Sequence, residues 1–412
     1  MARARRLATS LVSVLLLVAT QASAAIAVPL AVRSTAPAPG GSTRPAWMDH
    51  IDAVIGDRPM SVVVGRDGER WYGHLGWVGR PPASNEKLLL SMALYDHYAS
   101  WKRIRTEAKA PSRPRHGVIR GNLWIVGHGD PEIDRPQIGR LAKEIDAAGV
   151  HLIRGSVVGG TGPFARDWWA KGWRDYFPAD YIPLPTALTY RENTSKGVHI
   201  RDPERRAAKR LTGQLERRGV AVRGDPAMGR IPRGLRRIAA LPSEPLRTII
   251  RHMDVWSRNF WAEVLGKRLG FDEFGRGTIT AGARAIDRFT DARGQDFRVY
   301  DSSGLSYANR ATAKGILELL WVAGGSPWGK TLRASLATGG QGTLKDRLVG
   351  VPIRAKTGTL HDASALSGWV RLETGRWVEF SILSNGFSEW TAKTLEDRIV
   401  RIVRTQASDP TP

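Results

Sequence analysis

The stretch Pro-Pro-Ala-Ser-Asn-Glu-Lys-Leu-Leu, residues 81–89, decides how the rest of the 412-residue chain is interpreted. The two prolines favour the start of a helix, and the apolar residues from Leu88 onward recur at helical spacing. Residues three apart on a helix are neighbours, with roughly 5–6 Å between their Cβ atoms. The S-x-x-K pattern therefore predicts that the Ser84 hydroxyl and the Lys87 amine lie within hydrogen-bonding reach.

This pairing favours nucleophilic catalysis by serine. A serine hydroxyl is a weak nucleophile until a base accepts its proton. The chain offers no recognisable Ser-His-Asp set, so Lys87 is the candidate base. A free lysine has a pKa of about 10.4 and is protonated at neutral pH. Burial and a second nearby cation lower such a pKa, and we expect Lys356 to be that cation.

Two further motifs follow in order: Ser257-Arg-Asn259 fits S-x-N, and Lys356-Thr-Gly-Thr359 fits K-T-G-T. Sets of this kind are typical of serine β-lactamases and penicillin-binding proteins. Lys356 lies on a predicted strand, where its ammonium can face the terminal carboxylate of a peptide.

The other K-T-G-T residues have predicted roles beside Lys356. Thr357 and Thr359 can hydrogen-bond the same carboxylate, and Gly358 lets a substrate lie close to the strand backbone. The backbone N–H groups of Ser84 and Thr359 are candidates for an oxyanion hole.

Periodicity along the rest of the chain predicts helices together with an antiparallel sheet, which indicates the α+β class. A hairpin is expected around Gly65-Arg-Asp-Gly68, and a C-terminal helix places Leu395 and Ile399 on one face. The other expected strands are residues 122–126, 150–153, 155–158, 219–222, 351–356, 363–372 and 377–383, and the other expected helices are residues 138–149 and 204–218.

Composition describes a globular protein, with 42% hydrophobic and 25% charged residues. The absence of cysteine excludes disulfides, thiol catalysis and cysteine-ligated metals. Arg3, Arg5 and Arg6 precede an apolar run and an Ala-Ser-Ala site at residues 22–24, which is typical of a signal peptide. The run is short for a membrane span. We therefore expect an exported protein in a cell wall or periplasm-like space.

The formal net charge of +23 favours anionic partners, such as nucleic acid, anionic lipid or acidic wall polymers. Export argues against nucleic acid. Arginine is used heavily along the whole chain, so a general compositional bias explains the charge equally well.

Beyond the three motifs, the chain resembles the low-molecular-mass class C penicillin-binding proteins, the D-alanyl-D-alanine carboxypeptidase/endopeptidase family. The resemblance runs from Trp47 to about Ala407. It is carried by residues 82–89, Asn-Leu-Trp-Ile-Val-Gly-His-Gly-Asp-Pro at 122–131, Met-Asp-Val-Trp-Ser-Arg-Asn-Phe-Trp-Ala-Glu at 253–263, Asp-Ser-Ser-Gly-Leu-Ser at 301–306, and Asn309-Arg310.

The resemblance implies a serine peptidase that acts on peptidoglycan stem peptides and is acylated by penicillin. Ser84 would attack the penultimate D-alanine carbonyl with Lys87 as base, and water would hydrolyse the acyl-enzyme. Ser257 and Asn259 would relay protons and hold the substrate amide. Lys356, Thr357, Gly358 and Thr359 would form the carboxylate site. The resemblance implies no metal and no organic cofactor.

The resemblance also implies a domain plan. Composition, independently of the resemblance, predicts residues 1–24 as the signal peptide and residues 25–44 as a flexible leader rich in Ala, Pro, Ser and Thr. Residues 45–104 and 245–407 would form the catalytic domain, an antiparallel sheet with helices on both faces. Residues 105–244 would form one smaller inserted α/β domain, and the family's third domain would be missing near residues 193–203.

Several residues depart from the family pattern or invite a second interpretation. Arg258 is expected to add a cation at the cleft, and Glu86 to point away from Ser84. His128 invites a metal-site hypothesis, but loop structure is the better interpretation because no helical His pair accompanies it. The tryptophans at 168, 169 and 173 are expected to pack between domains rather than to line a glycan groove.

Two other functions stay open from the sequence. A serine β-lactamase would need a rapid deacylation device, and no Glu-x-x-Leu-Asn pattern lies between the first two motifs. A catalytically weak wall-binding or penicillin-sensing protein would use the same fold, although intact Ser84, Lys87 and Lys356 argue against it.

Overall fold

The computed structural model describes residues 44–408, which lie in one compact unit that starts at Arg44. The predicted signal peptide, nearly all of the predicted leader and the last four residues lie outside the described residues. Within residues 44–408, no helix combines the length and the apolar character that a membrane span requires.

The main sheet has five antiparallel strands in the order β13-β14-β15-β1-β2. The predicted hairpin around Gly65-Arg-Asp-Gly68 is confirmed, since β1 and β2 pair directly. The sheet joins the two ends of the chain, because β1 also pairs with β15. Its strands are β1 (Met60–Arg66), β2 (Glu69–His74), β13 (Ile353–Leu360), β14 (Ala363–Arg371) and β15 (Trp377–Asn385).

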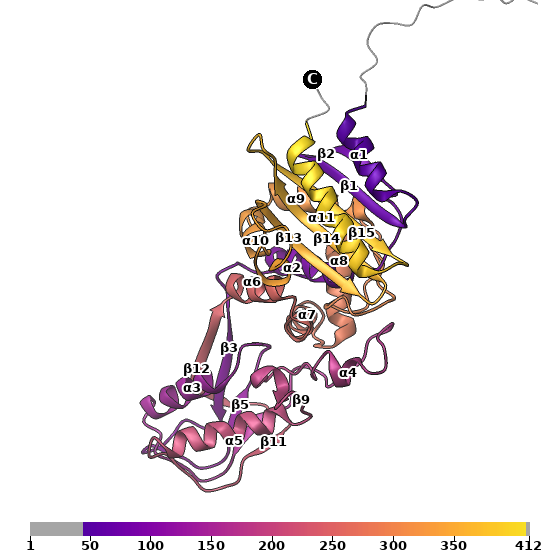
Figure 1. Cartoon of the computed structure of the whole chain (residues 1–412). Helices are drawn as coiled ribbons and strands as arrows, with labels where there is room; N and C mark the ends of the chain where they lie inside the picture. The colour runs from indigo at the N-terminus through magenta and orange to yellow at the C-terminus, as the bar shows by residue number, and fades with distance from the viewer. Residues whose placement is uncertain (1–43, 409–412) are drawn as a thin grey trace, which may run out of the picture. The chain divides into compact units, whose positions relative to one another are not determined.

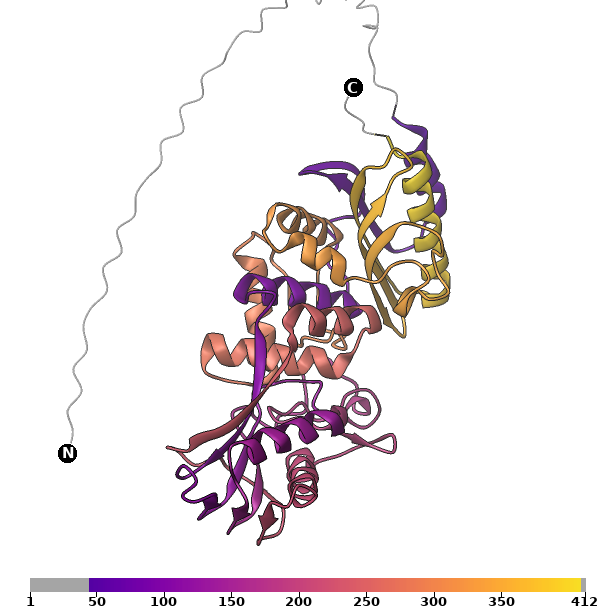
Figure 2. The same ribbon diagram turned by 90° about the vertical axis from the view of Figure 1, so that its left-hand side faces the viewer.

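Helices cover both faces of this sheet, as the α+β prediction requires (Figures 1 and 2). One face packs against α1 (Ala46–Ile55) and α11 (Glu389–Gln406), with Ile51 and Ile399 fully buried in the shared core. The other face packs against a helical core. This core contains α2 (Glu86–His97), α6 (Leu246–Trp256), α7 (Asn259–Phe274), α8 (Ile279–Asp291), α9 (Ala313–Gly325) and α10 (Gly329–Ser335).

A second five-stranded sheet lies between α2 and α6 in the sequence, in the order β11-β7-β5-β3-β12. Its two longest strands, β3 (Arg103–Ala110) and β12 (Arg236–Pro245), were not predicted from the sequence and pair with each other. Strands β5 (Leu123–Val126), β7 (Val157–Gly160) and β11 (Ala227–Gly229) are parallel. A small sheet of β4 (Val118–Ile119), β6 (Leu152–Ile153) and β10 (Ala221–Val222) accompanies them.

Two amphipathic helices bury their apolar faces in this region: α3 (Arg135–Ala147) and α5 (Pro203–Glu216). Asp134 caps α3 by accepting a hydrogen bond from the Gln137 amide at 3.3 Å. The mixture of parallel strands and helices agrees with the inserted α/β architecture. Its boundaries at residues 105 and 244 stay a prediction. The connecting elements are α4 (Phe177–Asp180), the 3₁₀ turn η2 (Arg191–Asn193), β8 (Thr194–Ser195) and β9 (Val198–His199).

Candidate active site

Ser84 lies in a 3₁₀ turn, η1 (Ala83–Asn85), directly before α2. The α-helix was predicted to start at Ser84 but begins two residues later at Glu86. The predicted pairing nevertheless forms, because the Lys87 Nζ atom lies 2.9 Å from the Ser84 Oγ atom. Lys87 is fully buried, whereas Ser84 is partly exposed. The hydroxyl therefore faces solvent and the amine lies beneath it.

Two glycines allow other segments to approach the Ser84 turn closely. Ala83 has a left-handed backbone with φ 47°, and its carbonyl packs against Gly304. A Cβ atom on Gly304 would lie 1.9 Å from the Ala83 carbonyl oxygen. A Cβ atom on Gly358 would lie 3.0 Å from the Ser84 nitrogen. The turn is thus held between the 301–306 loop and strand β13.

In its ammonium form Lys87 donates three hydrogen bonds: to Ser84, to the Asn259 Oδ1 atom at 2.8 Å and to the Ser303 carbonyl at 2.5 Å. Burial lowers the pKa of Lys87 to about 8. The nearby carboxylates, led by Asp301, oppose this shift because they favour the ammonium form. Burial outweighs them, so a substantial fraction of Lys87 is neutral near physiological pH.

Asn259 and Ser257 lie at the junction between two helices. Ser257 follows α6 in a left-handed conformation with φ 53°, and Asn259 is the first residue of α7. The junction directs both side chains toward lysines. Ser257 Oγ accepts from the Lys356 Nζ atom at 3.0 Å, just as Asn259 accepts from Lys87.

Lys356 lies within β13 and is fully buried. Its Nζ atom also donates to the Thr357 carbonyl at 2.8 Å. Burial lowers the pKa of Lys356, and the Lys87 charge lowers it further, whereas Asp254 raises it. The effect runs from Lys87 to Lys356. Burial, and not the Lys356 charge, is the main cause that lowers the pKa of Lys87, so the predicted role of Lys356 as the cation that depresses the pKa of Lys87 stays a prediction.

The predicted residues meet at one cleft of about 730 Å³. Ser84, Ser257, Asn259, Thr357 and Thr359 line it. The remaining predicted residues, Lys87, Lys356 and Gly358, are buried beside it. Residues that are up to 275 positions apart in the chain (Ser84 and Thr359) thus share one cavity.

Buried carboxylates that were not predicted as site residues support the floor of the site. Asp301 accepts from the Gly304 and Ser306 amides at 3.0 and 2.9 Å. Glu263 accepts from the Ser302 and Ser303 amides at 2.9 and 2.8 Å, and burial raises its pKa to about 8. Both carboxylates therefore fix the loop whose Ser303 carbonyl accepts from Lys87. Both residues lie in stretches that carry the family resemblance, 253–263 and 301–306, which is the sequence feature that points to them.

Glu86 is fully buried, although it occupies the residue before the base. Its Oε2 atom accepts from the Asn309 side chain at 3.4 Å. Burial raises the pKa of Glu86 well above its ordinary value, with Asp301 as the next cause. Glu86 thus contacts the acidic floor of the site rather than the nucleophile.

The prediction that Arg258 adds a cation to the cleft is wrong. Its guanidinium lies 2.5 Å from the Glu192 carboxylate, and the Trp261 indole donates to the same oxygen at 2.9 Å. Arg258 is therefore absent from the cleft lining. The carboxylate on η2 draws the guanidinium away from the cavity.

The tryptophans and His128 have structural contacts. Trp173 is buried and donates to Asp301 at 2.7 Å, and Trp168 donates to the Ile182 carbonyl. Trp169, in contrast, is 47% exposed, and packing of these tryptophans between domains stays a prediction. His128 pairs with Glu107 at 3.0 Å, and residues 44–408 hold no cluster of three His, Cys, Asp or Glu side chains arranged for a metal.

Known proteins resemble this chain over most of its length. The model of the D-Ala-D-Ala carboxypeptidase 3 (S13) family matches residues 59–196 and 185–406. A D-alanyl-D-alanine carboxypeptidase of Actinomadura sp. (strain R39) is 28% identical over 449 residues, which cover 85% of this chain and 83% of the relative. A carboxypeptidase of Mycobacterium tuberculosis is 26% identical, covering 87% of this chain and 82% of the relative.

Solved structures agree on the fold. Penicillin binding protein 4 from Haemophilus influenzae superposes with a TM-score of 0.76 and 18% identity, over 87% of this chain and 99% of that chain. A β-lactam complex of the same protein gives a TM-score of 0.69. The family match spans far more than half of the sequence, so this chain belongs to the D-Ala-D-Ala carboxypeptidase 3 (S13) family and is a serine-type, low-molecular-mass class C penicillin-binding protein.

Proposed function

We propose that the chain cleaves the terminal D-alanine from peptidoglycan stem peptides through an acyl-enzyme on Ser84. The observation that carries this proposal is the buried amine of Lys87, 2.9 Å from the Ser84 hydroxyl. The hydroxyl oxygen attacks the penultimate D-alanine carbonyl while Lys87 accepts the hydroxyl proton. The peptide C–N bond then breaks, and the departing amine of D-alanine takes up a proton.

The hydrogen bonds of Lys87 suit a neutral amine that acts as a base. A neutral amine has two N–H groups and one lone pair. The Asn259 Oδ1 atom and the Ser303 carbonyl can only accept, so they take the two N–H groups. The lone pair then points to the Ser84 hydroxyl, which becomes the donor. This arrangement orients the base before any substrate arrives.

Lys356 and the threonines of the motif are proposed to bind the terminal carboxylate. Thr357 and Thr359 line the cleft, with Lys356 buried directly behind them. A bound carboxylate would favour the ammonium form of Lys356 and so raise its depressed pKa again. Ser257 bridges Lys356 and the cleft, and we assign it the relay of a proton to the leaving amine.

The same site is proposed to react with penicillin, since the β-lactam carbonyl would take the place of the peptide carbonyl. The backbone N–H groups of Ser84 and Thr359 would stabilise the oxyanion in both reactions. Water completes the peptidase cycle by hydrolysing the ester. Cleavage of peptide cross-links would use the same steps with a longer leaving group.

Export to a cell wall or periplasm-like space is part of the proposal. It is supported by the basic and apolar N-terminus, residues 1–24, and by the location of the substrate in the wall. The test is the mass of the N-terminus of the protein recovered outside the cytoplasm. Cleavage after Ala24 agrees with the proposal, and an intact Met1 on cytoplasmic protein contradicts it.

Release of D-alanine from a stem pentapeptide tests the activity. The wild-type protein and a Ser112→Ala control, altered at an exposed serine, should release D-alanine at equal rates, and Ser84→Ala should release none. Equal release by Ser84→Ala would overturn the assignment of the nucleophile. Rapid, repeated hydrolysis of penicillin without D-alanine release would favour a β-lactamase. The absence of both reactions would favour a binding protein.

A further inference from the structure

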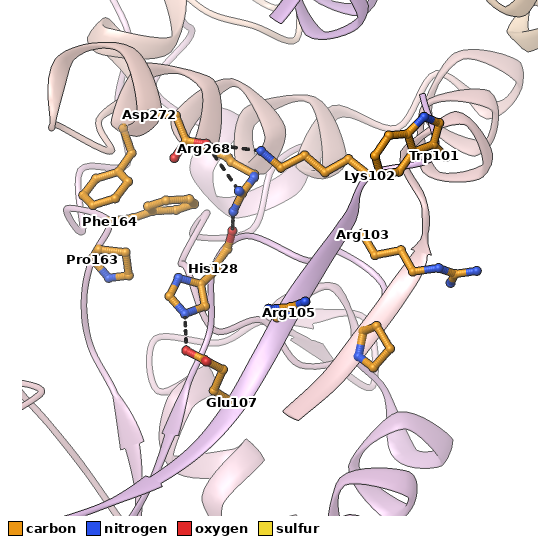
Figure 3. A pocket seen from close by; sticks show the side chains of 12 residues that line it. Trp101, Lys102, Arg103, Arg105, Glu107, His128, Pro163, Phe164, Arg268 and Asp272 are labelled. Carbon is orange, nitrogen blue, oxygen red and sulfur yellow. Dashed lines mark hydrogen bonds and ion pairs between the residues drawn. The ribbon is translucent and has the colours of Figure 1, made fainter. Parts of the chain in front are cut away.

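A second cavity, of about 640 Å³, lies away from the catalytic residues (Figure 3). This volume falls within the roughly 300–1,000 Å³ of ordinary ligand pockets. The residues around it come from the segment between α2 and β3, from β3 and β12, from the loops after β5 and β7, and from α7. None of the predicted catalytic or carboxylate-binding residues lines it, and the proposed peptidase chemistry leaves it without a role.

Positive charge exceeds negative charge in the walls of this cavity. Lys102, Arg103, Arg105 and Arg268 line it, whereas its acidic residues are Glu107 and Asp272. Arg268 bonds the His128 carbonyl at 2.6 Å and Asp272 at 3.3 Å. Figure 3 shows these contacts as a connected row from Asp272 to Glu107.

Both carboxylates are already engaged by neighbouring groups. Glu107 contacts Lys109 at 2.7 Å, His128 at 3.0 Å and Arg237 at 3.6 Å. Asp272 accepts from the Tyr98 hydroxyl at 2.7 Å and lies 3.9 Å from Lys102. These two acids therefore leave the arginines of β3 without an anionic partner.

Arg103 and Arg105 occupy alternate positions of β3, so they project from the same face of the strand. Both are exposed. Arg103 donates to the neutral Ser243 carbonyl at 2.5 Å. The side chain of Arg105 makes no hydrogen bond or ion pair with any residue in 44–408. A planar guanidinium of this kind is suited to bidentate binding of carboxylate or phosphate.

Trp101 adds a flat apolar surface beside these cations. Its side chain is 71% exposed, and it makes no ring contact within the described part of the chain. Exposure of a large indole costs hydration free energy, and such residues are enriched at binding surfaces. The C–H face of a sugar ring packs against an indole, while acidic substituents on that sugar can reach the guanidinium groups.

We infer that this cavity binds an acidic oligosaccharide, that is, a sugar chain bearing carboxylate or phosphate groups. The positive charge of the cavity and the exposed indole indicate this class of ligand. The further statement that the ligand is a cell-wall polymer rests on the proposed function. Carboxylates would come from muramyl sugars, and phosphates would come from phosphodiester-linked wall polymers.

Calorimetric titration of the protein with three probes tests the inference. They are a tetrasaccharide of alternating N-acetylglucosamine and N-acetylmuramic acid, a glycosylated glycerol-phosphate hexamer, and neutral chitotetraose. At least one acidic probe should bind, and Arg105→Ala and Trp101→Ala should each weaken it about tenfold or more. The affinity should fall as salt rises.

Two matched variants separate this site from the general positive charge of the protein. Arg205→Ala alters an exposed arginine on α5, and Trp77→Ala alters a tryptophan that is also 71% exposed. Neither residue lines the cavity, so both variants should bind like wild type. Equal weakening by Arg205→Ala, equal binding of chitotetraose, or no binding of either acidic probe would overturn the inference.

D-alanine release from a free pentapeptide keeps the two proposals apart. The variants at Arg105 and Trp101 should retain wild-type rates on this small substrate, because they lie outside the catalytic cleft. If the wild-type protein binds the oligosaccharide but releases no D-alanine, the peptidase proposal is refuted and the binding inference stands. The acidic probe that binds identifies the source, carboxylated glycan or phosphate polymer.

Discussion

At the scale of single residues, the site depends on two lysines that the protein buries completely. Burial disfavours the charged form of an amine, and it lowers the pKa of Lys87 despite the surrounding carboxylates. The nucleophile itself stays partly exposed. The Ser84 hydroxyl is therefore accessible to the substrate, whereas the Lys87 amine is shielded from water.

Removal of the Lys87 amine should abolish most of the acylation. General-base catalysis typically contributes about 100- to 10,000-fold, so Lys87→Met should slow acylation by penicillin within that range. Stopped-flow measurement of adduct formation gives the rate. Lys330→Met, at an exposed lysine on α10, should acylate like wild type. A Lys87→Met rate within a factor of a few of wild type would exclude Lys87 as the base.

The acylation rate should rise with pH through about 8. Only neutral Lys87 accepts a proton, and its pKa in the folded protein is lowered to about 8. The neutral fraction therefore increases about tenfold per pH unit below that value and levels off above it. A pH series of second-order acylation rates measures the profile. A rate that is independent of pH between 6 and 9 would contradict this assignment.

At the scale of elements, the site is assembled by turns in which ordinary residues adopt left-handed backbone. Ala83 precedes the nucleophile, Ser257 ends α6, and η2 holds a run of three such residues, Arg191 to Asn193. Each such residue costs on the order of 1 kcal/mol. In η2 the buried Asn193 side chain offsets this by bonding the Leu184 carbonyl and Thr186.

Gly304 provides a test of how the loop supports the nucleophile. Gly304→Ala places a Cβ atom 1.9 Å from the Ala83 carbonyl oxygen in a backbone with φ 78°. Gly294→Ala has a similar φ of 74° with nothing within 4 Å of the new atom. We expect Gly304→Ala to lose about 1 kcal/mol or more of unfolding free energy beyond Gly294→Ala, and to acylate more slowly. Equal urea midpoints and equal rates would contradict this packing.

Glu192 should position the second motif through Arg258 and Trp261. Both Glu192 and Arg258 are 36% exposed, so Glu192→Ala should cost at most about 1 kcal/mol of unfolding free energy. Acylation should nevertheless slow several-fold because Arg258 lies between Ser257 and Asn259. Glu216→Ala, at an exposed glutamate of α5, is the control. Unchanged acylation in Glu192→Ala would remove this positioning role, while a rate regained in Glu192→Asp would support it.

Elements with a clear local period could be predicted from the sequence, and elements that depend on distant pairing could not. The β1–β2 hairpin, β14, β15, α3, α5 and α11 all carry their periodicity within one segment. Strand β3 was missed because it contains few apolar residues, so the alternation of polar and apolar side chains typical of a strand is weak. Its partner β12 also lies more than 120 residues away in the sequence. Long-range pairing leaves little local signal.

At the scale of the whole molecule, the order of the three motifs was enough to predict which residues form the site. The electrostatics of the site depend on tertiary packing. Ser84, Ser257 and Lys356 were predicted to converge from their order and spacing, and they line or adjoin one cleft. The burial of Glu86 and Glu263, and the withdrawal of Arg258 toward Glu192, depend on neighbours from other segments. Contacts with residues from distant segments cannot be predicted from a local sequence pattern.

Distant segments of the chain fold into one reactive centre around Ser84. Peptide mapping of penicillin-treated protein by mass spectrometry checks this convergence. One penicilloyl group per chain is expected, located on the peptide that contains Ser84 and absent from Ser84→Ala. An adduct on a different serine, or a folded wild-type protein that penicillin leaves unmodified, would show that Ser84 is not the nucleophile of this centre.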